Sequence, residues 1–171
     1  MSSAALNALS SNQLSVLETR DVALLSTTQI SQLSTRQISR LSDDQLNALS
    51  TAQLVAMTTT QVAALTSDQL NSMVSTNLQA LTTAQVAALT TDQANALTTD
   101  QVISLSTAQF KVLTSAQLNA LDSVQIASIE TADVAVLTTA QIANLVTVSV
   151  GKLTTDQIVA LSTAQVKAMT S

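Results

Sequence analysis

Apolar residues recur along this chain with a period of eight. Residues 81–88 read LTTAQVAA, residues 89–96 read LTTDQANA and residues 97–104 read LTTDQVIS. When each unit is numbered from its leucine, position 1 is Leu, Met or Ile and position 6 is apolar in every unit. Position 3 is Ser or Thr except at Asp43, and position 5 is Gln in 16 of the 21 full units. The units run without insertion from Met1 to a partial unit at residues 169–171. This predicts one domain, a single uninterrupted octapeptide-repeat array over residues 1–171.

A period of eight matches neither a continuous helix nor a straight strand. In an α-helix, eight residues rotate by about 800°, so the apolar stripe would drift by about 80° per unit and could not stay buried. In a strand, the steps of five and three residues between positions 1 and 6 are both odd, so the apolar side chains would fall on opposite faces. We therefore expect the chain to bend once in every unit.

Each unit carries the pattern of a helix start. In residues 82–85, TTAQ, the Thr82 hydroxyl can accept from the Gln85 N–H while the Gln85 side chain accepts from the Thr82 N–H, which is a capping box. Leu81 and Val86 occupy the hydrophobic-staple positions of the same register. Acidic residues at position 4 fall in the first turn, where the helix dipole favours negative charge. They are Asp44, Asp68, Asp92, Asp100 and Asp156.

These observations predict the fold class. Each unit is expected to form a helix of about six residues, roughly 9 Å long, and helices this short must stack because they do not persist alone in water. We predict an all-α solenoid of very short helices, one per 8-residue repeat, with Leu, Val/Ile and Ala inside and with small position-8 residues that let neighbouring helices approach. A β-solenoid is the alternative, because a strict Thr row could form a ladder and Thr and Val suit strands. A long helix or an assembly-dependent fold is also left open.

The choice of capping residue stays open at this point. Position 3 admits fewer replacements than position 2, which accepts Glu18, Val74, Asp122, Glu130 and Val146. Either hydroxyl could be the cap, or position 3 has a second role, such as a bond to the next coil.

The composition excludes several classes of protein. Apolar residues make up 46% of the chain and mean hydropathy is +0.35, whereas disordered chains are poor in apolar residues. Ser, Thr or Gln interrupts every apolar run long before the roughly 18 residues that a membrane span needs. The start of the chain, MSSAALNALSS, shows no charged-then-apolar signal peptide. With one Gly, one aromatic residue and no Pro, ordinary loops and an ordinary aromatic core are not expected either.

The charged and nucleophilic residues do not predict a reaction. The net charge of −5 and the single aromatic residue argue against nucleic-acid binding. There is no His to act as a base for a Ser or Thr nucleophile, no Cys, and one Gly, too few for a phosphate-binding loop. Lys111, Lys152 and Lys167 lie at positions 7 or 8 without an evident partner. We predict that the protein is not an enzyme, with no catalytic, cofactor-binding or metal-binding residues and no cofactor.

Among the five units without Gln at position 5, three raise a functional question. Residues 145–152, LVTVSVGK, lose the Gln and contain the one Gly; they could be a hinge, a break or a partner-binding edge, or simply a decayed unit. Residues 18–21 and 130–133, ETRD and ETAD, share a concerted change to Glu at position 2 and Asp at position 5. Carboxylates suit Ca²⁺, but two per unit are too few for a cage unless neighbours contribute, and each could be an alternative cap.

The sequence LTTAQVAALTTDQ (residues 81–93) resembles the octapeptide arrays of large bacterial surface or secreted exoproteins, and the resemblance covers the whole chain. It implies an extracellular or cell-surface spacer, adhesin-like stalk or filament. Haem, which is part of the name often given to such regions, finds no ligand here, because His, Tyr and Cys are absent and the four Met occupy position 1.

Two functions from different classes follow. The first is a structural repeat protein, an extracellular spacer or a self-assembling filament subunit; no polar capping unit is visible near Met1 or Met169, so head-to-tail association with further copies is expected. The second is a regular Thr array that binds ice or a crystalline polysaccharide. The first predicts the protein itself as partner, and neither predicts nucleic acid or a membrane span.

Overall fold

The computed structural model describes residues 5–6, 8–145 and 147–169, and these residues form a succession of short α-helices, one for each octapeptide. No strand occurs in these residues, so the predicted all-α solenoid of short helices is confirmed and the alternative β-solenoid is wrong. The helices are α2 (Ser11–Ser15), α3 (Thr19–Ala23), α4 (Thr27–Gln32), α5 (Thr35–Ile38), α6 (Asp43–Asn47), α7 (Thr51–Ala56), α8 (Thr59–Ala63), α9 (Ser67–Ser72), α10 (Ser75–Ala80), α11 (Thr83–Ala87), α12 (Thr91–Ala96), α13 (Thr99–Ser104), α14 (Thr107–Val112), α15 (Ser115–Ala120), α16 (Ser123–Ser128), α17 (Thr131–Val136), α18 (Thr139–Ala143), α19 (Thr147–Val150), α20 (Thr155–Val159) and α21 (Thr163–Ala168).

The helices fall into two compact units, Met1–Ala88 and Leu89–Ser171, here called the first half and the second half. The boundary lies between two octapeptides. The prediction of one domain over residues 1–171 stays a prediction.

Where position 2 is Ser, Thr or Asp122, its side chain caps the helix that follows, which settles the question that the sequence left open. Thr82 has extended φ and ψ of −68° and 159°, its hydroxyl accepts from the Gln85 N–H, and the Gln85 side chain accepts from the Thr82 N–H. Leu81 is also extended, with φ −63° and ψ 141°. Two extended residues at positions 1 and 2 thus turn the chain between helices. Where position 2 is Glu18, Val74 or Glu130, the side chain makes no capping bond.

The two threonines of one unit should therefore differ in their contribution to stability. We expect Thr82→Ala to lower the free energy of unfolding by about 1 kcal/mol, because the Gln85 N–H loses its acceptor. Thr83→Ala should change it by less than about 0.5 kcal/mol, because Thr83 is an exposed first helical residue. Urea unfolding followed by circular dichroism measures both. Equal losses would mean that the position-2 cap is not what holds the helix start.

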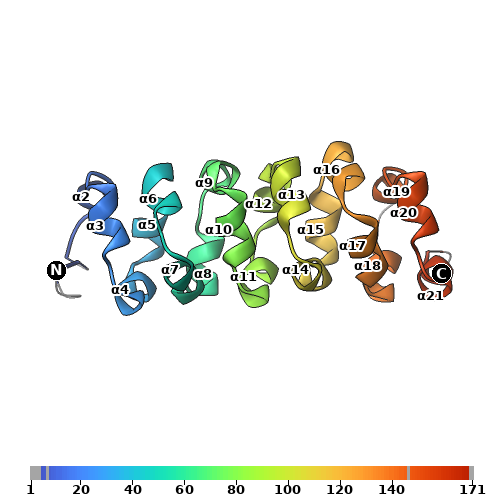
Figure 1. Cartoon of the computed structure of the whole chain (residues 1–171), viewed down its shortest axis with the longest axis horizontal. Coiled ribbons are helices and arrows are strands. Elements are labelled where there is room, and N and C mark those ends of the chain that lie inside the picture. Colours follow the sequence, from blue (N-terminus) through green and yellow to red (C-terminus); the bar gives the residue numbers. More distant parts are fainter. Residues whose placement is uncertain (1–4, 7, 146, 170–171) are drawn as a thin grey trace. The chain divides into compact units, whose positions relative to one another are not determined.

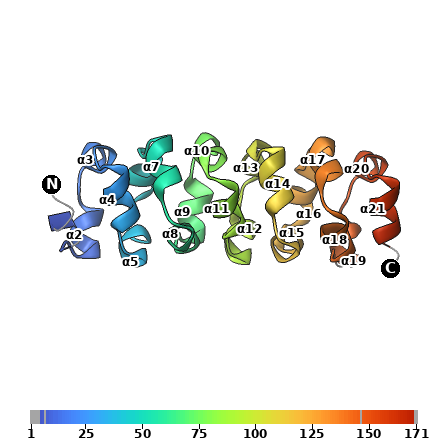
Figure 2. The same cartoon turned by 90° about the horizontal axis from the view of Figure 1, so that it is seen from below.

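Within each half, helices pack beside the helix three repeats further along. In the first half the contacting pairs are α2–α5, α3–α6, α4–α7, α5–α8, α6–α9, α7–α10 and α8–α11, and in the second half they are α12–α15, α13–α16, α14–α17, α17–α20 and α18–α21. Figures 1 and 2 let the reader follow this order within each half, for example from α4 to α7 and from α14 to α17. Three octapeptides therefore separate neighbours in adjacent coils, a value that the eight-residue period alone could not supply.

The core consists of positions 6 and 1. Position 6 is buried in every unit from Leu6 to Ile142, and position 1 is buried from Leu25 to Leu137. The predicted inside place of position 8 needs correction, because this position is half-buried from Ala48 to Val136. Most Gln side chains of position 5, from Gln37 to Gln165, are buried.

Candidate functional site: the glutamine clamp between coils

The most elaborate polar arrangement in the structure is built on the position-5 glutamine. Gln61 is 2% exposed. Its Oε1 accepts from the Thr58 N–H at 2.7 Å, which closes the capping box of its own helix. Its Nε2 donates to the carbonyl oxygens of Ile30 at 2.8 Å and Leu33 at 2.7 Å, at the junction of α4 and α5 in the preceding coil. One amide thus satisfies the start of one helix and the end of another, and we call this arrangement the glutamine clamp.

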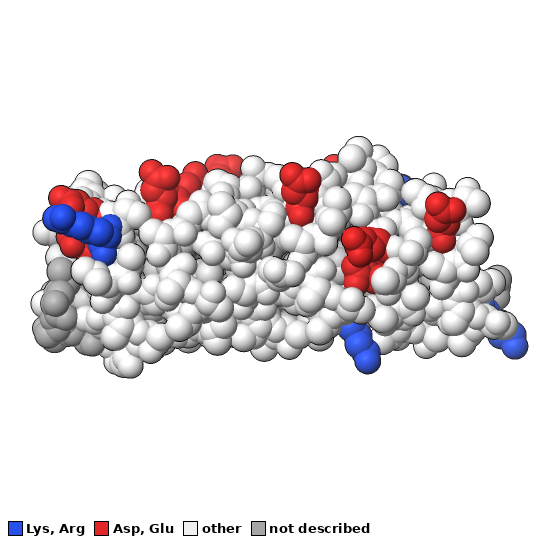
Figure 3. Space-filling model, viewed as in Figure 1, with Lys and Arg blue, Asp and Glu red and all other residues white. Residues whose placement is uncertain are grey.

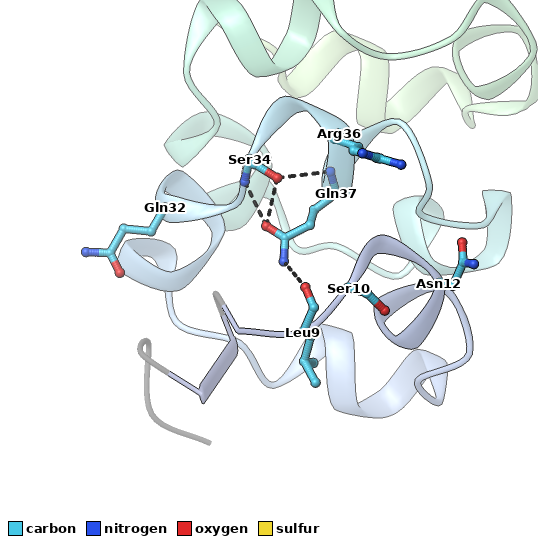
Figure 4. Close-up of a pocket in the computed structure, with 7 residues that line it drawn as sticks. All are labelled: Leu9, Ser10, Asn12, Gln32, Ser34, Arg36 and Gln37. Carbon is cyan, nitrogen blue, oxygen red and sulfur yellow. Dashed lines mark hydrogen bonds between the residues drawn. The ribbon is translucent and has the colours of Figure 1, made fainter.

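The clamp repeats with the same spacing in both halves. In each case Nε2 lies 2.5 to 3.1 Å from the carbonyl oxygen 28 residues earlier, and in most cases it also reaches the carbonyl 30 or 31 residues earlier. Figure 4 shows it at Gln37, between Ser34 of its own helix start and the carbonyl of Leu9. The clamp is present at Gln37, Gln45, Gln53, Gln61, Gln69 and Gln85 in the first half and at Gln117, Gln125, Gln141, Gln157 and Gln165 in the second.

The clamp explains why position 5 is Gln and not Glu. Either residue can close a capping box, but only the amide also carries a donor for carbonyl oxygens. Position 5 is Gln in 16 of 21 units and is never Glu. The sequence analysis assigned the Gln to the box alone and missed its second role, although the absence of Glu was a visible sign of it.

An asparagine ladder supports the same coil spacing. Asn47 donates to the carbonyl of Ser72 at 3.0 Å, Asn95 to that of Ala120 at 2.8 Å and Asn119 to that of Asn144 at 3.0 Å. Asn recurs at position 7 every 24 residues, at 47, 71, 95 and 119. This second period, three octapeptides long, is a sequence sign of the coil length that the analysis did not use.

The unit of residues 73–80 shows how the clamp can be rebuilt from other residues. Val74 stands at the cap position and Asn77 at position 5. Asn47 of the preceding coil accepts from the Val74 N–H at 2.9 Å, and the shorter Asn77 amide donates to the Asn47 carbonyl at 3.2 Å. Both ends of the clamp are thereby satisfied without a glutamine.

At Asp133 an acceptor replaces the amide donor. Asp133 is 4% exposed, and its carboxyl accepts a hydrogen bond from Thr107, a position-3 residue of the preceding coil. The second role suggested for position 3 is thus present at this place. Burial raises the pKa of Asp133 above its ordinary 3.8, the bond from Thr107 lowers it and the charge of Glu130 raises it again, with a net rise.

Asp133 should therefore make stability depend on pH. A folded-state pKa above the unfolded value means that the folded chain binds the proton more tightly, so this contribution is complete below pH 3.8 and is lost as the pH rises through the raised pKa. From pH 3.8 upward we expect the wild type to lose stability relative to Asp133→Asn. At neutral pH, Asp133→Gln should stabilise by about 1–3 kcal/mol, because its amide can donate to the preceding coil. Urea midpoints across pH measure both, and parallel curves for wild type and Asp133→Asn would refute the pH dependence.

The carboxylates considered for a metal site differ in exposure and in their partners. Glu18 and Asp21 are exposed, and Arg20 Nε lies 2.8 Å from a Glu18 carboxylate oxygen and 3.8 Å from one of Asp21. In the second such unit Glu130 is exposed while Asp133 is buried. Over the described part of the chain, no three or more His, Cys, Asp or Glu side chains gather as a metal site would require. The shared Glu and Asp thus serve a surface ion pair in one unit and a buried hydrogen bond in the other.

The lysines and the cavity beside Gln37 add no further cluster of polar groups to the clamp. Lys111 and Lys167 are exposed, whereas Lys152 donates to the carbonyl of Leu121 at 2.9 Å. A cavity of about 430 Å³ opens beside Gln37 and Arg36, and in Figure 4 the Gln37 amide within it is engaged in its clamp. Among the described residues, no helix combines the length and the apolar content that crossing a bilayer requires.

Comparison with known proteins agrees with the repeat architecture. The family model of the ALTTAQ repeat matches residues 14–51, 44–75, 72–107 and 126–163 in tandem. No curated protein matches the chain.

Proposed function

Because the chain belongs to the ALTTAQ repeat family, we propose that it is a non-enzymatic structural protein, an extracellular spacer or self-assembling filament subunit whose length is set by its number of repeats. The observation that carries the proposal is the glutamine clamp. Each clamp joins one coil to the coil before it, across 28 to 31 residues, and uses the residues that recur in nearly every unit. The buried glutamines thus hold successive coils together, which supports a structural role.

Association with further copies follows from the same chemistry. Most coils carry both clamp amides and carbonyl acceptors, so a coil from a second copy offers complementary groups. The resemblance of the octapeptides to arrays of bacterial surface and secreted proteins supports a place outside the cell.

The spacer proposal predicts a fixed increment of length. We would insert a second copy of residues 57–80, which is one coil in register, and compare the maximum dimension in solution by small-angle X-ray scattering. One and two inserted coils should add equal lengths. As a matched control, an insertion of 12 residues breaks the octapeptide register and should reduce helicity without adding an ordered increment. Unequal increments for whole coils would overturn the proposal.

Self-association is tested separately by negative-stain electron microscopy across a concentration series. Filaments of constant width that lengthen with concentration are expected. Discrete particles at every concentration would refute the filament and leave the spacer.

A regular threonine surface is the second candidate function. Thr35, Thr59 and Thr83 begin α5, α8 and α11, which lie side by side in the first half, and all three side chains are exposed. The second half repeats this column on α14, α17 and α20, with Thr107, Thr131 and Thr155. Figure 3 shows that charged side chains are sparse on the face in view, in line with 10% charged residues. Arg36, Glu130 and Asp156 stand next to three of these threonines, whereas Thr59 and Thr83 have no charged neighbour in sequence. A row of hydroxyls with few charges is suited to ice or a crystalline polysaccharide.

Thermal hysteresis tests this candidate. Activity that falls in Thr59→Lys but persists in Thr51→Lys, an exposed threonine of a different column, would support ice binding. A chain without thermal hysteresis, and without retention on insoluble polysaccharide, would eliminate the candidate.

A further inference from the structure

The irregular repeat, residues 145–152, combines three departures from the clamp, and we propose that it is a built-in yield point: the place where the helix stack of the second half opens first. The sequence marked this unit only as irregular. In the structure, both the hydrogen bonds and the apolar packing of this repeat are incomplete.

The first departure is a buried hydroxyl without a hydrogen bond. Ser149 occupies the position of the clamp glutamine and is 1% exposed. Its Oγ has no hydrogen-bond partner, and it is the one buried side-chain N or O atom among the described residues for which this holds. A buried polar group in this state favours any opening that lets water reach it.

The second departure is a replaced clamp. A glutamine at position 149 would reach the carbonyls of Leu118 and Leu121, 31 and 28 residues earlier, as Gln157 reaches those of Ile126 at 2.7 Å and Ile129 at 2.8 Å. At the irregular repeat, Lys152 Nζ donates to Leu121 alone, at 2.9 Å. An ammonium on a flexible stem is strongly hydrated, so water competes for this bond more readily than for a buried amide.

The third departure is a gap in the packing. A cavity of about 20 Å³ lies between the irregular repeat and the preceding coils, lined by apolar side chains and by Ser149; the apolar lining includes Leu118, Ile126, Leu145 and Leu153. Side chains that face a gap lose contacts on that side. The helix of this unit, α19 (Thr147–Val150), has only four residues, so it adds few backbone bonds of its own.

Together the three features place the lowest opening energy of the second half at one repeat. Regions with few contacts and incomplete polar pairing open locally while the rest of a structure stays folded. The neighbouring unit, residues 153–160, has a full clamp at Gln157, so the opening is expected to stop there. A tandem array with one such unit would separate at a defined place when it is stretched or heated.

Hydrogen exchange of the full chain, followed by mass spectrometry, tests the proposal. The informative amides are those of Leu121 and Leu153, which lie at the two sides of the irregular contact. The matched amides at the regular contact are those of Ile129 and Leu161. Each of these four N–H groups donates to the carbonyl three residues before it. We expect exchange at the irregular contact to be at least about tenfold faster than at the regular one, since an unmet buried polar group changes an opening equilibrium by such a factor. Equal rates at the two contacts would overturn the proposal.

Variants assign the effect to the residues named. Ser149→Gln combined with Lys152→Ala restores the regular unit and should bring the two contacts to within about twofold, whereas Lys152→Ala alone should make exchange at Leu121 faster still. Gln157→Ser introduces the same defect at the regular contact and should transfer fast exchange to Ile129. Should the double variant fail to fold, Gln157→Ser decides: unchanged exchange at Ile129 refutes the proposal, as does a folded double variant that still exchanges fast at Leu121.

Discussion

Replacing Gln61 by Met should lower the free energy of unfolding by about 3–5 kcal/mol. The Met side chain fills a similar volume, so the loss comes from the hydrogen bonds of the amide to the Thr58 N–H and to the carbonyls of Leu33 and Ile30. The Ile30 carbonyl keeps a bond from the Leu33 N–H, so the Thr58 N–H and the Leu33 carbonyl account for most of the loss. A buried backbone group left without its partner costs about 1–3 kcal/mol, and the coil that contains Gln61 would lose this clamp to the preceding coil. The measurement is urea unfolding followed by circular dichroism at 222 nm.

Two control variants separate the clamp from the capping box. Gln13 closes a box with Ser10 but is exposed, so Gln13→Met should cost no more than about 1 kcal/mol. Gln61→Glu keeps the acceptor for the Thr58 N–H but brings a buried carboxylate against two carbonyl oxygens, so it should cost at least as much as Gln61→Met at neutral pH. A Gln61→Met variant no less stable than Gln13→Met would show that the bonds across the coils add nothing to stability.

Phe110→Ala should lower the free energy of unfolding by about 3–5 kcal/mol, which is the usual cost of deleting a buried aromatic ring. Phe110 is fully buried and has the largest side chain among the fully buried residues described. Its ring stands at position 6, which is Leu, Val or Ile in most units, so the surrounding coil is shaped for more volume than an alanine provides. Thermal and urea unfolding both report the loss, and a change below about 1.5 kcal/mol would mean that the coil collapses around the deletion.

The ring also has a candidate counterpart in its own coil. Ala94, Val102 and Phe110 occupy position 6 of three successive helices, α12, α13 and α14, and all three are buried. We expect the small Ala94 and the large Phe110 to compensate in volume. Ala94→Leu alone should then cost about 1–3 kcal/mol through overpacking, and Phe110→Leu in the same chain should recover most of that loss. Strict additivity of the two substitutions would show that the side chains do not share space.

The local structure could be predicted from the sequence because its determinants lie within one unit. Thr82, Gln85 and the staple residues Leu81 and Val86 are at most five positions apart, so the helix start and its register followed from known capping chemistry. The Gln61 clamp could not, since its bonds to Ile30 and Leu33 depend on how many units complete a coil. The 24-residue recurrence of Asn47, Asn71 and Asn95 held that information. The partner of Lys152 was hidden for the same reason, because Leu121 lies a whole coil away.

The direction of the glutamine clamp has a consequence for how the chain is made. Every clamp donor reaches carbonyls that precede it in the chain, by 28 to 31 residues, so a newly emerged repeat finds its acceptors already outside the ribosome. The sequence separation of these contacts does not grow as repeats are added, and the entropy of loop closure per repeat therefore stays constant. Such a chain can fold vectorially, one coil at a time, and a longer gene need not encode a slower-folding product.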